Sequence, residues 1–103
     1  MQKAYINLVN YALDNGCTVS VFDGEEWSTV KSTRFNDITN DIEGVEEANI
    51  VIRDANGIKV GWALVSAFGL APDETVVDYG ITPFMKGWEA QYYPLTLLCE
   101  VTA

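Results

Sequence analysis

The stretch ANIVIRDANGIKVGWALVSAF, residues 48–68, contains two alternating apolar patterns on either side of a turn dipeptide. Ile50 and Ile52 alternate with other side chains before the turn, and a second alternation follows it. Successive side chains of a strand point to opposite faces, so each pattern predicts a half-buried strand. Asn56-Gly57 favours the positive backbone dihedrals of a two-residue type I′ turn. The stretch therefore predicts a central antiparallel hairpin.

The second strand of this hairpin has two unlike faces. One face is large and apolar, and it carries Ile58, Val60, Trp62 and Leu64. The other face is mostly small, and it carries Lys59, Gly61, Ala63 and Val65. A glycine within a strand often marks a place where another backbone approaches closely. We therefore expect a helix or a second chain to pack on the small face.

Two segments before the hairpin have helical spacing of apolar residues. The first runs from Lys3 to Asn15, and Gly16 follows where a left-handed C-cap residue is favoured. The second begins after Ser32 or Thr33, either of which suits an N-cap. Its apolar stripe consists of Phe35, Ile38, Ile42 and Val45, and Gly44 is expected to end the helix.

Between these helices, residues 17–33 read as another hairpin. Val19 and Val21 alternate with polar residues, and Asp23-Gly24 supplies a turn. A less regular return strand starts near Trp27. Its pairing register cannot be fixed from the pattern.

The last third of the chain begins with a loop at residues 69–74, followed by a strand over residues 75–81. Thr82-Pro83 has the composition of a helix start. We expect Pro94 to stop this short helix and residues 95–103 to form a closing strand, with Leu95, Leu97, Cys99 and Val101 pointing inward.

The predicted order is helix, hairpin, helix, hairpin, strand, short helix, strand. Short connections between successive strands favour antiparallel pairing. The chain is therefore predicted to be a single compact α+β domain spanning residues 1–103. Its sheet is mainly antiparallel and is packed with two longer helices and one short helix.

Composition narrows the classes of function. The 103 residues include 15 acidic and 6 basic side chains, giving a net charge of −9, and there is no histidine. Such a charge repels nucleic acid and anionic lipid and attracts basic protein surfaces, so direct nucleic-acid binding is not expected. With no apolar run of about 20 residues and no signal peptide, a membrane span is not expected. Two separate cysteines fit reduced thiols in the cytoplasm, although a long-range bridge between Cys17 and Cys99 stays open.

The usual catalytic and cofactor motifs are missing. Without histidine, the Ser-His-Asp and Cys-His arrangements are excluded as they are usually built. The glycines are isolated and match neither phosphate-binding fingerprint, and no acidic stretch has the spacing of a calcium loop. We therefore predict no catalytic residue, no cofactor and no metal.

Three acidic clusters remain as candidates for contact with a protein partner. They lie at residues 23–26, 37–47 and 73–74, and the first is followed by a tryptophan, a residue enriched at interfaces. The predicted contact residues are Asp23, Glu25, Glu26, Trp27, Asp37, Asp41, Glu43, Glu46, Glu47, Asp73 and Glu74. One helix of about eleven residues spans only about 16 Å, so a large docking surface needs several of these segments side by side.

No specific family is identified from these residues. In size, acidity and lack of cofactor motifs, the chain resembles the small non-enzymatic proteins with which phages and mobile elements occupy host targets. Two stretches, residues 35–52 and 60–85, contain acidic side chains but no basic residue. We therefore expect the chain to bind a basic surface on a nucleic-acid-processing host protein, as a nucleic-acid mimic or inhibitor. The first alternative is an accessory or structural module with no inhibitory role, in one version a homodimer paired through an edge strand at residues 19–22 or the closing strand. The lesser alternative is a carboxylate-based enzyme.

Overall fold

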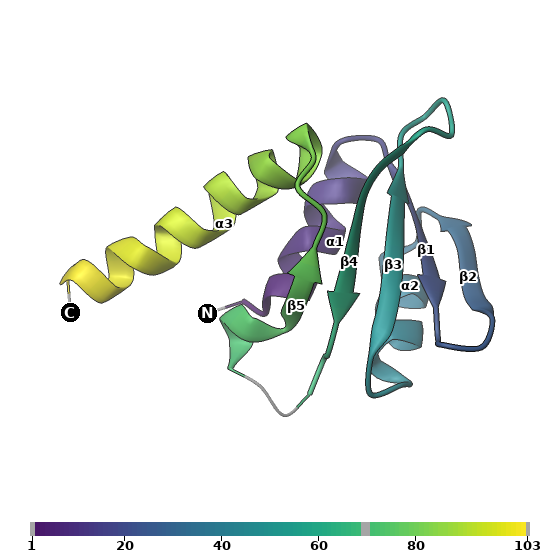
Figure 1. Cartoon of the computed structure of the whole chain (residues 1–103), viewed down its shortest axis with the longest axis horizontal. Helices are drawn as coiled ribbons and strands as arrows, with labels where there is room; N and C mark the ends of the chain where they lie inside the picture. The colour runs from purple at the N-terminus through teal and green to yellow at the C-terminus, as the bar shows by residue number, and fades with distance from the viewer. Residues whose placement is uncertain (1, 69–70, 103) are drawn as a thin grey trace.

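Five strands form one antiparallel sheet in the computed structural model of the chain, in the order β2-β1-β3-β4-β5 (Figure 1). The structure describes residues 2–68 and 71–102, with side chains as far as Tyr93. The strands are β1 (Thr18–Phe22), β2 (Trp27–Ser32), β3 (Ala48–Arg53), β4 (Lys59–Val65) and β5 (Val76–Tyr79). The helices are α1 (Ala4–Asp14), α2 (Phe35–Glu43) and α3 (Pro83–Thr102), with a short 3-10 helix η1 (Pro72–Glu74). The predicted α+β class is confirmed.

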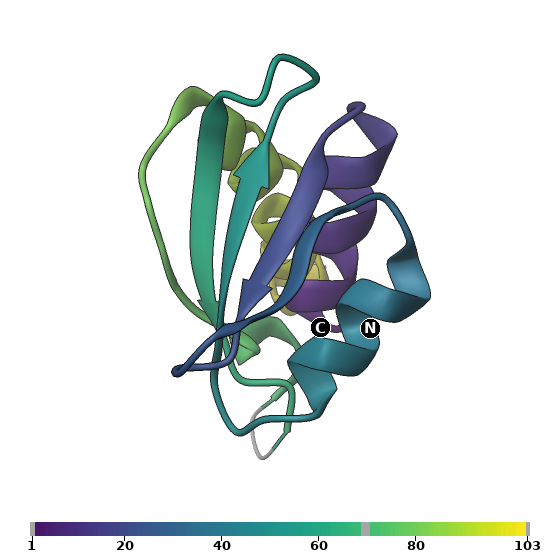
Figure 2. The ribbon, with the colours of Figure 1, turned by 90° about the vertical axis from the view of Figure 1, so that its right-hand side faces the viewer.

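The three helices lie on one face of the sheet and leave the other face open (Figure 2). The buried core fills the space between sheet and helices, and it includes Leu8 of α1, Ile38 of α2, Ile52 of β3 and Trp88 of α3. In Figure 1 the viewer looks at the open face, with α1 and α2 behind the strands.

The central hairpin is confirmed as β3 and β4, but its turn differs from the prediction. Five residues, 54–58, connect the strands, and only Gly57 has a positive φ, of 81°. The reason lies in Asp54, whose carboxylate accepts hydrogen bonds from the backbone N–H of Asn56 and of Ile58. The N–H of Asp54 also donates to the carbonyl of Ile58, so residues 55–57 form a three-residue loop inside this connection. A three-residue loop that ends with glycine is the next most common hairpin after the two-residue type.

The small face of β4 receives a helix, as predicted. Gly61, Ala63 and Val65 are buried, and α3 packs directly over Gly61. A Cβ atom added at Gly61 would lie 2.7 Å from Sδ of Met85. The absence of a side chain at this position therefore sets how close α3 comes to the sheet.

The first helix and hairpin also follow the prediction. Gly16 has a φ of 75° and donates its N–H to the carbonyl of Leu13, so it ends α1 in the left-handed conformation. Val19 and Val21 are buried under the helices. The β1–β2 register shifts on both sides of Val21, which explains why the return strand had no clear alternation.

The start of α2 differs from the prediction. Its N-cap is Arg34, and neither Ser32 nor Thr33 caps the helix with its side chain. Ser32 instead accepts a hydrogen bond from the N–H of Arg34 itself, at 3.0 Å. The apolar stripe is correct, since Ile38 and Ile42 are fully buried, and the helix ends before Gly44.

The prediction for the C-terminal end is wrong. Helix α3 does not stop at Pro94 but continues to Thr102, so residues 95–102 form no strand. Leucine and glutamate are good helix formers, and a helix already started can pass a proline at the loss of one backbone hydrogen bond. In Figure 1 this part of α3 extends away from the sheet. The predicted inward positions of Leu95, Leu97, Cys99 and Val101 lie outside the described side chains.

The start of α3 is as predicted. Thr82 caps the helix, because its Oγ1 accepts a hydrogen bond from the N–H of Met85 at 3.2 Å. The same hydroxyl donates to the carbonyl oxygen of Val60 at 2.6 Å, which ties the helix start to β4.

Replacing Thr82 with alanine is expected to lower the free energy of unfolding by about 1 kcal/mol, since both bonds of the cap hydroxyl are lost. Thr82→Ser keeps the hydroxyl and serves as the control. Urea denaturation of the three proteins measures the difference, and equal stability of the alanine and serine variants would contradict the cap.

Candidate functional site: an acidic end of the sheet

Three connections leave the sheet at the same end, because of the strand register. Phe22 at the end of β1 pairs with Asn49 near the start of β3, and Ala48 pairs with Val65 at the end of β4. Val65 in turn pairs with Val76 at the start of β5. The β1–β2 turn, the α2–β3 connection and the β4–β5 connection therefore share one end, the lower end in Figure 1.

These connections carry most of the predicted contact residues. We call the following eight the acidic end: Asp23, Glu25, Glu26, Glu43, Glu46, Glu47, Asp73 and Glu74. Four inter-strand spacings of about 4.8 Å make this end about 19 Å wide. B-DNA of that length carries about eleven phosphate charges, at one per 1.7 Å of axis. The eight carboxylates of the acidic end are thus comparable in number to the phosphates of a duplex of this length.

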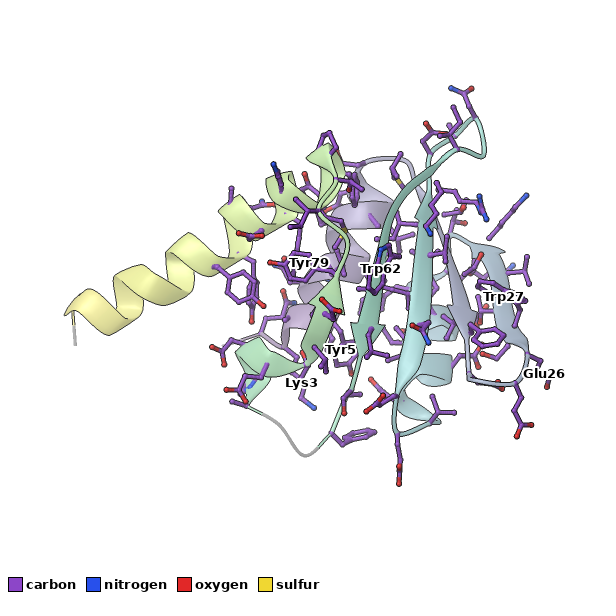
Figure 3. All side chains as sticks on the ribbon, viewed as in Figure 1. Lys3, Tyr5, Glu26, Trp27, Trp62 and Tyr79 are labelled. Carbon is purple, nitrogen blue, oxygen red and sulfur yellow. The ribbon has the colours of Figure 1, made fainter. Side chains whose placement is uncertain are left out.

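The β1–β2 turn is held by its own first residue. The carboxylate of Asp23 accepts hydrogen bonds from the N–H groups of Glu25 at 2.9 Å and Glu26 at 2.8 Å. The bond from Glu26, and to a smaller extent the bond from Glu25, lowers the pKa of Asp23 below its ordinary value. The side chains of Glu25 and Glu26 are exposed (Glu26 is labelled in Figure 3).

The middle of the acidic end is hollowed. A depression of about 570 Å³ is lined by the segment from Glu43 to Glu47 together with Ser66 and Phe68. Phe68 is 59% exposed, and the ammonium of Lys3 lies 5.1 Å from its ring centroid. The same ammonium donates to the carbonyl of Ala67 at 3.1 Å. This ring therefore already holds one cation of the chain itself.

Glu43 is joined to the core by Tyr5. The Tyr5 hydroxyl donates a hydrogen bond to the Glu43 carboxylate, and the Tyr5 ring is buried. Burial, together with this bond to an anion, raises the pKa of Tyr5 well above its ordinary value. The tyrosine therefore stays a neutral donor at physiological pH and fixes the position of Glu43.

The third acidic segment is fixed through its backbone. The Tyr93 hydroxyl of α3 donates to the carbonyl oxygen of Asp73 at 3.2 Å. Thr75, which is fully buried, donates to the carbonyl of Pro72 and accepts the N–H of Tyr5. Glu74 is exposed, whereas Asp73 is half-buried. Burial, together with the nearby charge of Asp73, raises the pKa of Tyr92 and of Tyr93.

Three predicted residues do not join this end. Asp37 and Asp41 line a groove of about 650 Å³ between β2 and α2, and Asp41 accepts a hydrogen bond from Thr29. Lys31 and Arg34 line the same groove, so its charge is mixed. Trp27 lies on the open face, 47% exposed, with its ring 5.2 Å from that of Phe22.

Most basic residues lie toward the opposite end of the sheet. Arg53 pairs with Lys59 beside the β3–β4 loop, and Arg34 follows the far end of β2. Lys86 is in the first turn of α3, which Thr82 holds near the start of β4. The sequence shows the numbers of charges but not this separation, since it depends on strand order.

Cys17 has no feature of a reactive thiol. It is a free, buried cysteine at the start of β1. Burial raises its pKa, and the nearby charge of Asp54 raises it further. The question of a bridge to Cys99 falls outside the described side chains.

Further findings concern metals, membranes and relatives. Within the described side chains, no group of three or more His, Cys, Asp or Glu residues is arranged to hold a metal ion. In residues 2–68 and 71–102, no helix combines the length and apolar character needed to cross a membrane. No family model, curated protein or solved structure matches the chain.

Proposed function

We propose that this protein is a non-enzymatic interaction protein of the cytoplasm that docks its acidic end on a basic surface of a nucleic-acid-processing protein. The observation that carries the proposal is the convergence of three sequence-distant acidic segments on one end of the sheet. A basic groove that binds nucleic acid is the complementary surface, since it accepts a row of closely spaced negative charges.

The site supports this function in two further ways. Glu43 and the turn at Asp23 are held by hydrogen bonds within the chain, so their charges are in place before a partner arrives. The hollow beside Phe68 is lined by three glutamates, which suit an arginine or lysine side chain of the partner.

A pair of variants with equal net charge tests the proposal. Glu46→Gln with Glu47→Gln removes two charges from the acidic end, whereas Asp14→Asn with Asp37→Asn removes two from elsewhere. Each immobilised protein is used to capture partners from the lysate of the natural host. Each exposed ion pair contributes about 0.2–1 kcal/mol, so we expect the first variant to bind about 2- to 30-fold more weakly and the second to bind like the wild type.

Salt dependence tests whether charge drives the docking, and competition by double-stranded DNA tests nucleic-acid mimicry. Capture is expected to weaken steeply as salt is raised. Double-stranded DNA is expected to displace the captured protein, because both compete for one basic surface. Equal binding by the two variants would contradict docking through the acidic end, and failure of DNA to compete would contradict nucleic-acid mimicry.

A further inference from the structure

The open face of the sheet is a second surface without a covering element in the described chain. We define the open face by its apolar residues: Phe22, Trp27, Val30, Val51, Trp62 and Leu64. Figure 3 shows Trp27 and Trp62 on this face, at two well-separated strands. Trp27 is 47% and Val30 is 65% exposed.

The apolar side chains are adjacent across the strands. Phe22 pairs with Trp27 on one side and with Asn49 on the other, and Val51 pairs with Trp62. Trp62 also lies close over Gly80, where an added Cβ would be 2.4 Å from the indole nitrogen. Trp62 therefore packs against Gly80 at the side of the face that borders β5. Two polar residues also lie on this face, Asn49 opposite Phe22 and Asp78 opposite Leu64. Apolar side chains grouped on one face with polar residues around them are typical of a protein contact.

Charges of opposite sign stand at the two ends of the open face. Lys31 and Arg53 line a hollow of about 200 Å³ with Ser20, Trp27 and Val30. Lys31 lies at the end of β2 that is far from the β1–β2 turn. The turn itself carries Asp23, Glu25 and Glu26 at the other end of the same two strands.

We infer that the open face binds a second copy of this chain, face to face, about a two-fold axis that runs across the strands. This rotation places β2 over β2 of the second copy but reverses its direction. The acidic β1–β2 turn of each copy then meets Lys31 and Arg53 of the other. The two-fold axis makes this contact form twice, once at each end of the interface, as an isologous interface requires.

Charge selects this axis over the alternative. A two-fold axis along the strands would place β2 of one copy over β5 of the other, with both acidic ends together. Carboxylates at the β1–β2 turn would then face Asp78 and the η1 acids of the second copy, and like charges in contact cost several kcal/mol. Strands packed face to face at about −30°, with sheets about 10 Å apart, accommodate the antiparallel arrangement.

The size of the face sets the strength of the dimer. A sheet about 19 Å wide with strands of about six residues offers roughly 400 Å² in outline to each copy. Interfaces of this size are at the small end and are transient. We therefore expect dissociation in the micromolar range or above, so that dilute protein is monomeric and concentrated protein is dimeric.

Sedimentation equilibrium from micromolar to millimolar concentration tests the inference. The mass is expected to rise from 11.4 kDa toward twice that value. Val51→Asp places a charge in the centre of the open face and should keep the protein monomeric at every concentration. Asn36→Asp adds the same charge on the exposed surface of α2 and should leave the dimer intact. Circular dichroism verifies that both variants are folded.

A charge exchange provides a test that does not depend on the stability of one variant. Lys31→Glu with Arg53→Glu, and separately Glu25→Lys with Glu26→Lys, should each dimerise at least tenfold more weakly, because like charges then meet at both contacts. An equimolar mixture of the two should dimerise again, since each contact pairs opposite charges.

Three results would overturn the inference. The first is a mass that stays at 11.4 kDa at every concentration, and the second is a dimer that Val51→Asp leaves unchanged. The third is a mixture of the two charge variants that dimerises no more tightly than each variant does alone. Binding of a single-stranded oligonucleotide to a monomer, abolished by Val51→Asp, would likewise assign the face to nucleic acid instead. The dimer shares the β1–β2 turn with the acidic end but leaves the Glu46–Glu47 segment outside it, so Val51→Asp tests the dimer alone and Glu46→Gln with Glu47→Gln tests docking alone.

Discussion

Replacing Trp88 with alanine is expected to lower the free energy of unfolding by about 3–5 kcal/mol, the usual loss for a fully buried large aromatic side chain. Trp88 is completely buried, and its ring lies 5.4 Å from that of Tyr79, 5.7 Å from Tyr92 and 5.6 Å from Tyr93. Its indole N–H donates to Oδ1 of Asn7 at 2.9 Å, joining α3 to α1. Domains of this kind have total stabilities of about 5–15 kcal/mol, so the loss is a large share.

Trp27→Ala is the matched control for this prediction. Trp27 is 47% exposed and makes one aromatic contact, with Phe22, so its removal should cost only about 1 kcal/mol. Urea denaturation followed by circular dichroism measures both variants. Equal losses at the two tryptophans would show that α3 does not pack on the core as described.

Gly61→Val is expected to destabilise the protein by about 1–3 kcal/mol, through overpacking between β4 and α3. The new Cβ would lie 2.7 Å from Sδ and 3.0 Å from Cγ of Met85, and 3.5 Å from Phe84. Valine otherwise favours strands over glycine, so strand preference alone predicts the opposite sign. A lower free energy of unfolding for Gly61→Val therefore supports the packing of α3 on Gly61, and a higher one would contradict it.

The double variant Gly61→Val with Met85→Ala provides the control. Removing the Met85 side chain makes room for the valine, so the two losses should not add. The same urea measurements give the coupling between the two positions. A double variant as unstable as the sum of the single ones would contradict the contact.

The sequence predicts the elements whose apolar period is regular and closed by local signals. Residues 48–68 alternate on both sides of their turn, and Gly16 and Thr82 mark a helix end and a helix start that the structure confirms. The β3–β4 turn was mispredicted because the hydrogen bonds of the Asp54 side chain competed with the preference of Asn-Gly. The C-terminal segment was mispredicted because a short run of leucines fits a strand and a helix equally well.

The order of the strands could not be predicted, and two functional expectations depended on it. Residues 19–22 belong to β1, which lies between β2 and β3, so they cannot pair with another chain as an edge strand. The edges are β2 and β5. The same order brings the turn at Asp23 and the segment at Glu46 to one end, although they are more than twenty residues apart.

The acidic site was therefore predicted in its residues but not in its shape. Eight of the eleven named residues share one end, whereas Asp37, Asp41 and Trp27 do not. Phe68 was not singled out, because a lone aromatic at the end of a strand has no distinguishing pattern. Its significance depends on the depression that it shares with Glu46 and Glu47.

The separation of charge along the strands gives the molecule a permanent electric dipole. Eight carboxylates stand at one end of the sheet, and Arg34, Arg53, Lys59 and Lys86 stand toward the other. In the field of a strongly basic surface such a molecule rotates during its approach, so that the acidic end arrives first. Productive encounters then become a larger fraction of all collisions, and the association rate rises at low ionic strength without any additional contact.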